Sequence, residues 1–175
     1  GTDIDESATP LIIASINGCV GAVELLIKAV GIDVNKANAD GLSPLNFAAF
    51  NGKNDSEHLK IVKLLLTAAN ININETKGAE NPFISAREGQ ALQSMYEILK
   101  HSEERKILLE IPYGEELYRV KKYEKESSER FPRLNPETIN VIEDIQTMLQ
   151  KGKFNAKKKK IEKNKAWWVE RRKTV

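Results

Sequence analysis

Residues 9–14 read Thr-Pro-Leu-Ile-Ile-Ala, and 34 positions later residues 43–48 read Ser-Pro-Leu-Asn-Phe-Ala. A weaker third copy, Asn-Pro-Phe-Ile-Ser-Ala, occupies residues 81–86. Recurrence at a period in the low thirties is typical of arrays in which short helical units stack on their neighbours. Such arrays function through an extended surface rather than through a pocket. The repeat therefore predicts both the fold and the kind of site to expect.

Each copy carries residues that begin and end a helix. Thr9, Ser43 and Asn81 can accept a hydrogen bond from a free backbone amide at a helix start. The proline that follows each of them has its φ already set for the first helical position. Gly18 and Gly52 suit a left-handed residue at the end of the first helix. These residues predict that each copy starts with a short helix at its Pro.

Further patterns predict the rest of each unit. Apolar stripes at helical spacing predict a second helix in the first two copies: Val23, Leu25 and Leu26, and then Val62, Leu64 and Leu65. Residues 32–35 and 70–74 alternate between apolar and polar side chains, which predicts the extended stem of a short hairpin.

The strings at residues 9–35, 40–52 and 58–74 resemble the ankyrin repeat. The pattern of that family runs G-x-T-P-L-H-x-A-x-x-G, then V-x-L-L, then D-V-N before the next turn. The resemblance covers residues 3 to about 100. It implies an all-α fold, a stack of helix-turn-helix repeats with short β-hairpin loops, followed by a C-terminal helical extension. We therefore expect about three repeats in residues 1–100 and the extension in residues 101–175.

The chain departs from the family pattern at three places. Ile12, Asn46 and Ile84 replace the His after Pro-Leu, so a hydrogen bond that normally ties neighbouring repeats is expected to be absent. The second copy carries about five extra residues, 53–57, between its helices. Residues 3–8 resemble the tail of a hairpin whose earlier half is missing. The first repeat is thus expected to be truncated at its N-terminal side, in a fragment of a longer protein.

The resemblance implies non-catalytic recognition of a protein partner. In an ankyrin-like stack, the hairpin tips and the first helix of each pair form the binding side. The predicted partner-binding residues are Lys36, Asn38 and Asp40 at one tip, Asn72, Glu75 and Lys77 at the next, and Asn46, Phe50 and Asn51 on the first helix of copy two. Phe50 is the expected aromatic anchor if it is exposed. Its alternative role is an ordinary contact with the neighbouring repeat.

Composition argues against other classes of site. Cys19 is the single cysteine and the two histidines are far apart in sequence, so neither a disulfide nor a metal site is predicted. The acidic residues have no partner base, nucleophile or Gly-rich loop in a catalytic pattern, and no catalytic or cofactor-binding residue is predicted. No apolar run approaches the length that spans a bilayer. The expected location is the cytoplasm, a reducing compartment, with the nucleus or a host-cell cytosol as alternatives.

The C-terminal part is predicted to be helical without resembling the repeat. A charged helix is expected over residues 114–127, with Leu117 and Val120 inward. Asn135 and Pro136 have the residue types that begin the next helix. The buried stripe of that helix is predicted to consist of Ile139, Ile142, Ile145 and Leu149.

Charge separates the two ends of the chain. Residues 151–175 hold eleven Lys and Arg against two Glu, a net of +9, whereas residues 1–150 have a net of −7. Phe154, Ile161, Trp168 and Val175 recur every seven residues, which places them along one side of a basic helix. The expected role of this helix is to cap the repeat stack or pack on the preceding helix.

The alternative is that the chain is a targeting or accessory domain of a larger protein, such as a bacterial effector. Its basic helix would then dock on an anionic membrane, nucleic acid or an import receptor. The acidic body argues against nucleic acid, and the narrow apolar stripe argues against a membrane surface. The residues of this predicted basic patch are Lys157, Lys158, Lys159, Lys160, Lys163, Lys165, Trp167, Arg171 and Arg172.

Overall fold

The computed structural model describes residues 8–53, 55–74, 81–130 and 135–152, and its regular structure in these ranges is helical, without a strand. The predicted all-α class is confirmed. The chain forms two compact units, Gly1–Glu110 and Ile111–Val175. Residue 100, near which the boundary was expected, lies inside a helix that ends at Arg105, and the first unit ends at Glu110.

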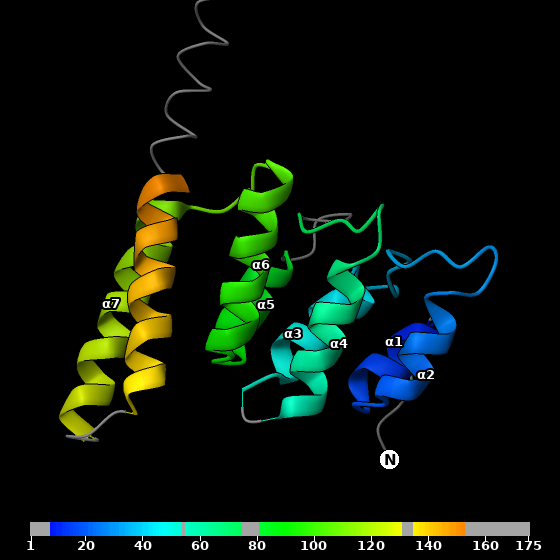
Figure 1. The fold of residues 1–175 in the computed structure, drawn as a ribbon, viewed down its shortest axis with the longest axis horizontal. Helices are drawn as coiled ribbons and strands as arrows, with labels where there is room; N and C mark the ends of the chain where they lie inside the picture. Colours follow the sequence, from blue (N-terminus) through cyan, green and yellow to red (C-terminus); the bar gives the residue numbers. More distant parts are fainter. Residues whose placement is uncertain (1–7, 54, 75–80, 131–134, 153–175) are drawn as a thin grey trace, which may run out of the picture. The chain divides into compact units, whose positions relative to one another are not determined.

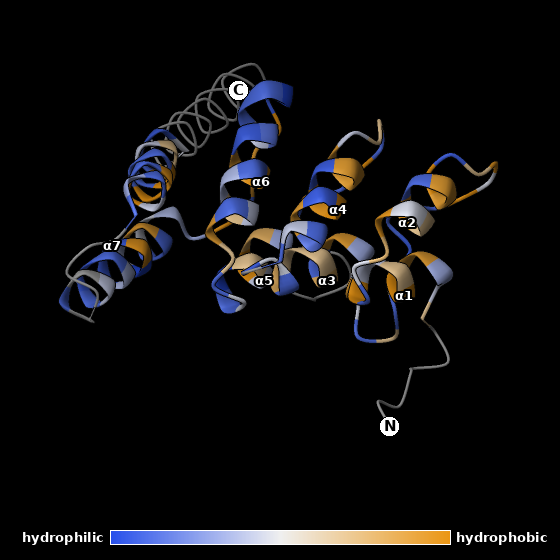
Figure 2. Cartoon of the chain, turned by 60° about the horizontal axis from the view of Figure 1, so that its bottom comes forward, coloured by the Kyte–Doolittle hydropathy of each residue, from blue (hydrophilic) through white to orange (hydrophobic). Residues whose placement is uncertain are grey.

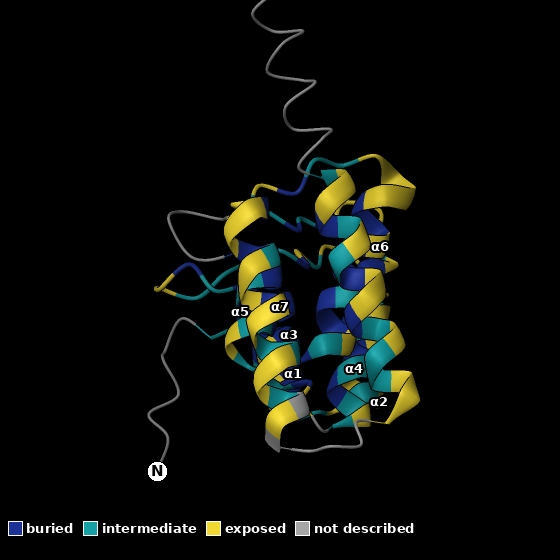
Figure 3. Ribbon diagram, turned by 90° about the vertical axis from the view of Figure 1, so that its left-hand side faces the viewer, coloured by how far each residue is buried: buried dark blue, intermediate teal, exposed yellow. Residues whose placement is uncertain are grey.

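The first unit consists of three helix pairs: α1 (Pro10–Ile16) with α2 (Val20–Leu26), α3 (Pro44–Asn51) with α4 (Ser56–Leu66), and α5 (Pro82–Glu88) with α6 (Leu92–Arg105) (Figure 1). The first helices of the pairs pack on one another in the order α1, α3, α5, and the second helices in the order α2, α4, α6. Viewed along the stack, the pairs form a first-helix row and a second-helix row (Figure 3).

The predicted helix starts are confirmed in all three copies. Thr9 Oγ1 accepts the amide of Ile12 at 3.2 Å, and Asn81 Oδ1 accepts the amide of Ile84 at 3.0 Å. In the middle copy Ser43 is part of a capping box. Because each cap satisfies an amide that the helix itself cannot, three helices of only seven or eight residues have defined starts.

The prediction of left-handed glycines is confirmed at Gly18 and wrong at Gly52. Gly18 has φ +68°, but Gly52 has φ −77°. In the third copy Gln90, with φ 55°, takes the place of Gly18. Both left-handed residues lie two positions before the next helix, whereas Gly52 lies four positions before α4. The longer connection in copy two removes the need for a positive φ. Gly52 instead permits close packing, since a Cβ there would lie 2.5 Å from Ser94 Oγ.

The buried core confirms the apolar stripe that was predicted for the second helix of the first copy only in part. Leu11, Leu45 and Phe83, at equivalent positions of the three first helices, are all fully buried. In α2, Val23 is buried, but Leu25 is 75% exposed, so its assignment to the core is wrong. Residues two apart on a helix lie about 200° apart around its axis, so Val23 and Leu25 cannot share a face.

The loops between repeats are joined by asparagine side chains. Asn35 donates to the carbonyl oxygen of Asn70 at 2.7 Å and accepts the amide of Asn72 at 2.8 Å. One repeat later, Asn74 donates to the carbonyl of Leu108 at 2.9 Å and accepts the amide of Glu110 at 2.7 Å. The same bidentate pairing therefore assigns residues 107–110 to the loop of the third repeat, which explains why the first unit extends to Glu110.

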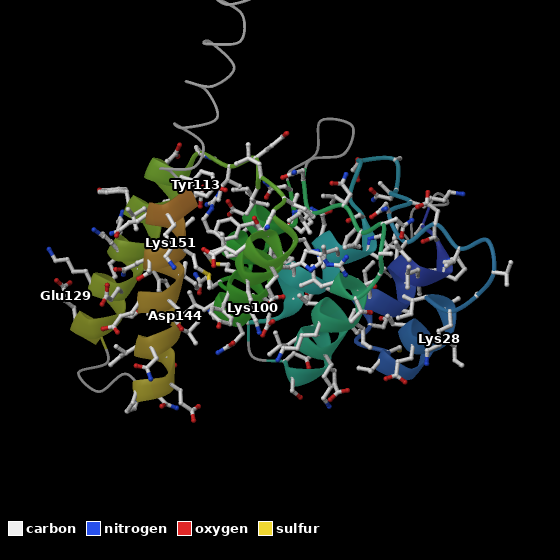
Figure 4. The ribbon with its side chains drawn as sticks, turned by 45° about the horizontal axis from the view of Figure 1, so that its top comes forward. Lys28, Lys100, Tyr113, Glu129, Asp144 and Lys151 are labelled. Atoms are coloured by element: carbon white, nitrogen blue, oxygen red, sulfur yellow. The ribbon has the colours of Figure 1, made fainter. Side chains whose placement is uncertain are left out.

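The second unit contains α7 (Tyr113–Arg130) and a helix over residues 136–152. The cap predicted at Asn135 is confirmed, because its Oδ1 accepts the amide of Glu137 at 3.0 Å. Gln146 donates to Glu124 at 2.6 Å, and a Cβ on Gly152 would lie 2.1 Å from the ring of Tyr113. The two helices are thus antiparallel neighbours (Figure 4). The predicted stripe is confirmed at the fully buried Ile142, Ile145 and Leu149, while Ile139 is half-buried.

Candidate recognition surface

The first loop tip is a tight turn whose predicted site residues have different roles. The amide of Asn38 donates to the carbonyl of Leu42 at 3.0 Å, and Asn38 Oδ1 accepts the amide of Leu42 at 2.9 Å. Gly41 completes the turn with φ 82°. Asn38 therefore builds the tip, whereas Lys36 and Asp40 are exposed on it.

The second predicted tip is described only as far as residue 74. Asn72 Oδ1 accepts the amide of Asn74 at 2.9 Å, and the Asn72 amide binds Asn35. Its side chain shapes the loop and its backbone joins two repeats. Glu75 and Lys77 lie outside the described residues, as does the whole predicted basic patch of residues 157–172.

The expectation that Asn46 lies on the exposed side of α3 is wrong, because this residue is 3% exposed. Asn46 Oδ1 accepts the amide of Ser43 at 3.0 Å and its hydroxyl at 2.7 Å, while Nδ2 donates to Ser85 Oγ on α5 at 2.9 Å. The predicted loss of the bond between repeats is therefore also wrong at this position. An Asn amide both accepts and donates, so it can serve its own cap and still reach the next repeat.

Replacing Asn46 with Ala is expected to lower the free energy of unfolding by roughly 2–3 kcal/mol, because the change leaves buried polar partners without a hydrogen bond. Asn51→Ala is the matched control. Asn51 Nδ2 bonds only within its own helix, to the carbonyl of Phe47 at 2.9 Å, so a loss below about 1 kcal/mol is expected. Chemical denaturation of both variants measures the difference, and equal losses would show that the bond to Ser85 adds nothing.

Phe50, whose predicted role as an anchor depends on its exposure, is 49% exposed, while Asn51 is half-buried. Sequence reasoning missed the equivalent position in the first copy, where Ile16 is 40% exposed. Ile13 and Phe47, one turn earlier on the same two helices, are half-buried. The repeat itself could have identified Ile13 and Ile16, because they lie 34 positions before Phe47 and Phe50.

A histidine ties the two repeats that present these side chains. His58 Nε2 lies 2.9 Å from the carbonyl oxygen of Ile16, and Nδ1 lies 2.5 Å from Asp55 Oδ2. Both neighbours accept hydrogen bonds, so the ring donates to both only in its doubly protonated form. Asp55 also caps α4 by accepting the amide of Glu57 at 2.8 Å. That backbone bond, followed by the bond from His58, lowers the pKa of Asp55.

The lowered pKa of Asp55 predicts an acid sensitivity. A carboxylate whose pKa is lower in the folded state contributes stability above its unfolded pKa of about 3.8 and loses it as the pH falls further. In Asp55→Asn, the free energy of unfolding is expected to fall less than in the wild type between about pH 4 and pH 2. Urea unfolding across this range measures the slopes, with Asp40→Asn at the exposed tip as control. Parallel slopes for the wild type and Asp55→Asn would contradict the prediction.

Other classes of site find no support in the part of the chain that the structure describes. No group of three or more His, Cys, Asp or Glu side chains there could hold a metal ion. None of the helices described is both long and apolar enough to cross a membrane. Cys19 is exposed and forms no disulfide.

Repeated helix pairs, capped in the same way and linked through equivalent loop asparagines, define a stacked helical-repeat protein. Residues 1–77 match the family described as ankyrin repeats (3 copies), which is the family that the sequence resembles. No curated protein matches the chain. Ankyrin repeats are non-catalytic scaffold modules that generally bind other proteins.

Proposed function

We propose that the repeat unit recognises a protein partner through the first-helix row and the adjoining loop tip. The observation that carries this proposal is the exposure of Phe50, a large aromatic side chain, on a helix whose other face is buried in the stack. Aromatic residues of this kind are enriched among the anchors of protein interfaces. Lys36 and Asp40 on the exposed tip add charged groups at the rim, where they influence association rate and specificity more than affinity.

The test is recovery of partners with variants of the whole chain. A specific partner is expected to bind the wild type and to be lost with Phe50→Ala. Tyr118→Ala is the control, because Tyr118 is 67% exposed but belongs to α7 of the second unit. A partner that is lost only with Tyr118→Ala would contradict recognition by the repeats.

A second candidate function rests on the charge separation. The net charge of +9 in residues 151–175 favours docking of this segment on an anionic surface, such as a membrane, nucleic acid or an acidic import receptor. In this case the chain would target a larger protein, for example a bacterial effector. Binding to anionic vesicles or DNA that weakens steeply with salt and is lost when Lys157–Lys160 become Gln would support it. The exposed thiol of Cys19 fits a reducing compartment such as the cytoplasm.

A further inference from the structure

The surface of α1 and α3 is free of charged residues. Residues 9–19 and 42–52, which span these helices and their ends, contain no Asp, Glu, Lys or Arg, although such residues make up 30% of the chain. The second-helix row is different, because α4 alone carries Glu57, Lys60 and Lys63. In the hydropathy colours α1 and α3 are largely tan and orange, whereas α6 is largely blue (Figure 2). The neutral surface is therefore a property of the first helices of the first two repeats.

Four apolar side chains form a regular array on this face, and we call Ile13, Ile16, Phe47 and Phe50 the apolar quartet. Within each helix the two members are three residues apart and share a face. Between the helices the equivalent members are one repeat apart, and α1 packs directly on α3. The core side of the same helices is made by other residues, which are buried: Leu11, Ile12, Ala14, Leu45, Ala48 and Ala49.

Two asparagines at equivalent positions border the quartet. Asn17 Nδ2 donates to the carbonyl of Ile13, and Asn51 Nδ2 donates to the carbonyl of Phe47, both at 2.9 Å. Each amino group uses one N–H within its own helix, so each asparagine can still offer a partner its second N–H and its amide oxygen. The border of the quartet is therefore polar but uncharged.

The array ends at the third repeat. There the equivalents of Phe47 and Phe50 are Ser85, which is buried, and Glu88, which is exposed and paired with Arg87 at 2.9 Å. A charged side chain of a partner thus finds a counterpart outside the quartet, at the α5 end or at the loop tip that carries Lys36 and Asp40. Over the quartet itself, a buried charge would lose its hydration without gaining a counter-charge.

The spacing of the quartet distinguishes between kinds of partner. Packed helices lie about 8–10 Å apart, so equivalent members on α1 and α3 are separated by roughly that distance. On a helix, residues seven apart share a face and rise about 10.5 Å, which matches. On a strand, residues that share a face are separated by about 6.7 or 13 Å, which does not match. A helix crossing the row thus fits better than an extended segment.

Resting on the proposed function, we infer that the apolar quartet binds one amphipathic helix of a partner protein, through an apolar stripe that carries no charge. Residues i and i+7 of that stripe lie over α1 and α3. Any acidic or basic residue of the partner helix that faces the repeats lies outside the quartet, at the α5 end or over the loop tip.

The test selects 18-residue helical peptides from a displayed library on the full-length chain and measures their affinity by fluorescence anisotropy. Enriched peptides are expected to share apolar residues at i and i+7 with no charge between them on that stripe. Ile16→Ser and Phe50→Ser are expected to raise Kd at least tenfold. Leu25→Ser, a similar change at an exposed leucine of α2, is the matched control and leaves Kd within twofold. Because no charge pair forms over the quartet, Kd changes less than about twofold from 50 to 500 mM NaCl. Circular dichroism confirms that each variant is folded.

Four results overturn the inference, and they differ in what they say of the proposed function. If the selected peptides bind through Lys36 and Asp40 with a steep salt dependence, the repeats still recognise a partner. The inference of an uncharged apolar stripe is then wrong. If no substitution at the loop tip or in the first-helix row changes the Kd of the selected peptides, both the inference and the proposed function are wrong. Dimers of the chain that Phe50→Ser dissociates assign the face to a second copy. A gain in peptide affinity with Trp168→Ser assigns it to the C-terminal segment of the chain itself.

Discussion

Replacing Gly89 with Ala is expected to lower the free energy of unfolding by more than about 3 kcal/mol, the upper end of the usual cost of overpacking. Gly89 ends α5, and a Cβ added there would lie 1.8 Å from the backbone oxygen of Phe50 and 2.6 Å from its carbonyl carbon. A backbone group cannot rotate away as a side chain can, so α3 and α5 must separate. Gly89 has φ −74°, which Ala adopts freely, and the clash is therefore the only source of the loss.

Gly21→Ala is the control for this change. Gly21 lies inside α2, and a Cβ there would have no neighbour within 4 Å. Because Ala has a higher helix propensity than Gly, this variant is expected to gain about 0.5–1 kcal/mol. Guanidinium unfolding monitored by circular dichroism measures both variants. A Gly89→Ala protein within 1 kcal/mol of the wild type would show that α3 and α5 do not pack so closely.

Local chemistry made much of the fold predictable, and its failures have physical causes. Thr9, Ser43 and Asn81 were identifiable because a helix cap depends on residues three positions apart. The conformation of Gly52 was not, because the length of the connection decides whether a positive φ is needed. Gln90 shows the converse, since the geometry required a left-handed residue although the sequence offers no glycine there.

The candidate site was less predictable than the fold, because exposure depends on neighbours distant in sequence. Asn46 and Phe50 lie on one short helix with no distinguishing local pattern. Asn46 can be buried because Ser85, 39 residues later, presents an oxygen to its amide. Phe50, one turn later on the same helix, is 49% exposed. The packing of α3 on α5, which the local sequence does not show, is what distinguishes Asn46 as a structural residue from Phe50 as a candidate anchor.

Leu45→Ala is expected to lower the free energy of unfolding by roughly 2–5 kcal/mol. Leu45 is fully buried in the central repeat, on a helix that packs against α1 on one side and α5 on the other. Removing its side chain leaves a cavity that neither neighbour can fill without disturbing its own contacts. In a stack held together by contacts between adjacent repeats, a defect at the centre weakens two interfaces rather than one.

Leu25→Ala is the matched control, and it is expected to change stability by less than about 0.5 kcal/mol. Both leucines lie in short apolar helices of equivalent repeats, and sequence pattern alone assigned Leu25 to the core. Its 75% exposure predicts the opposite outcome. Unfolding by guanidinium measures the difference between the two variants, since the substitution is identical and only burial changes. A loss of 2 kcal/mol or more with Leu25→Ala would mean that this leucine is covered in the folded protein. In that case α2 would have a neighbour besides α1 and α4.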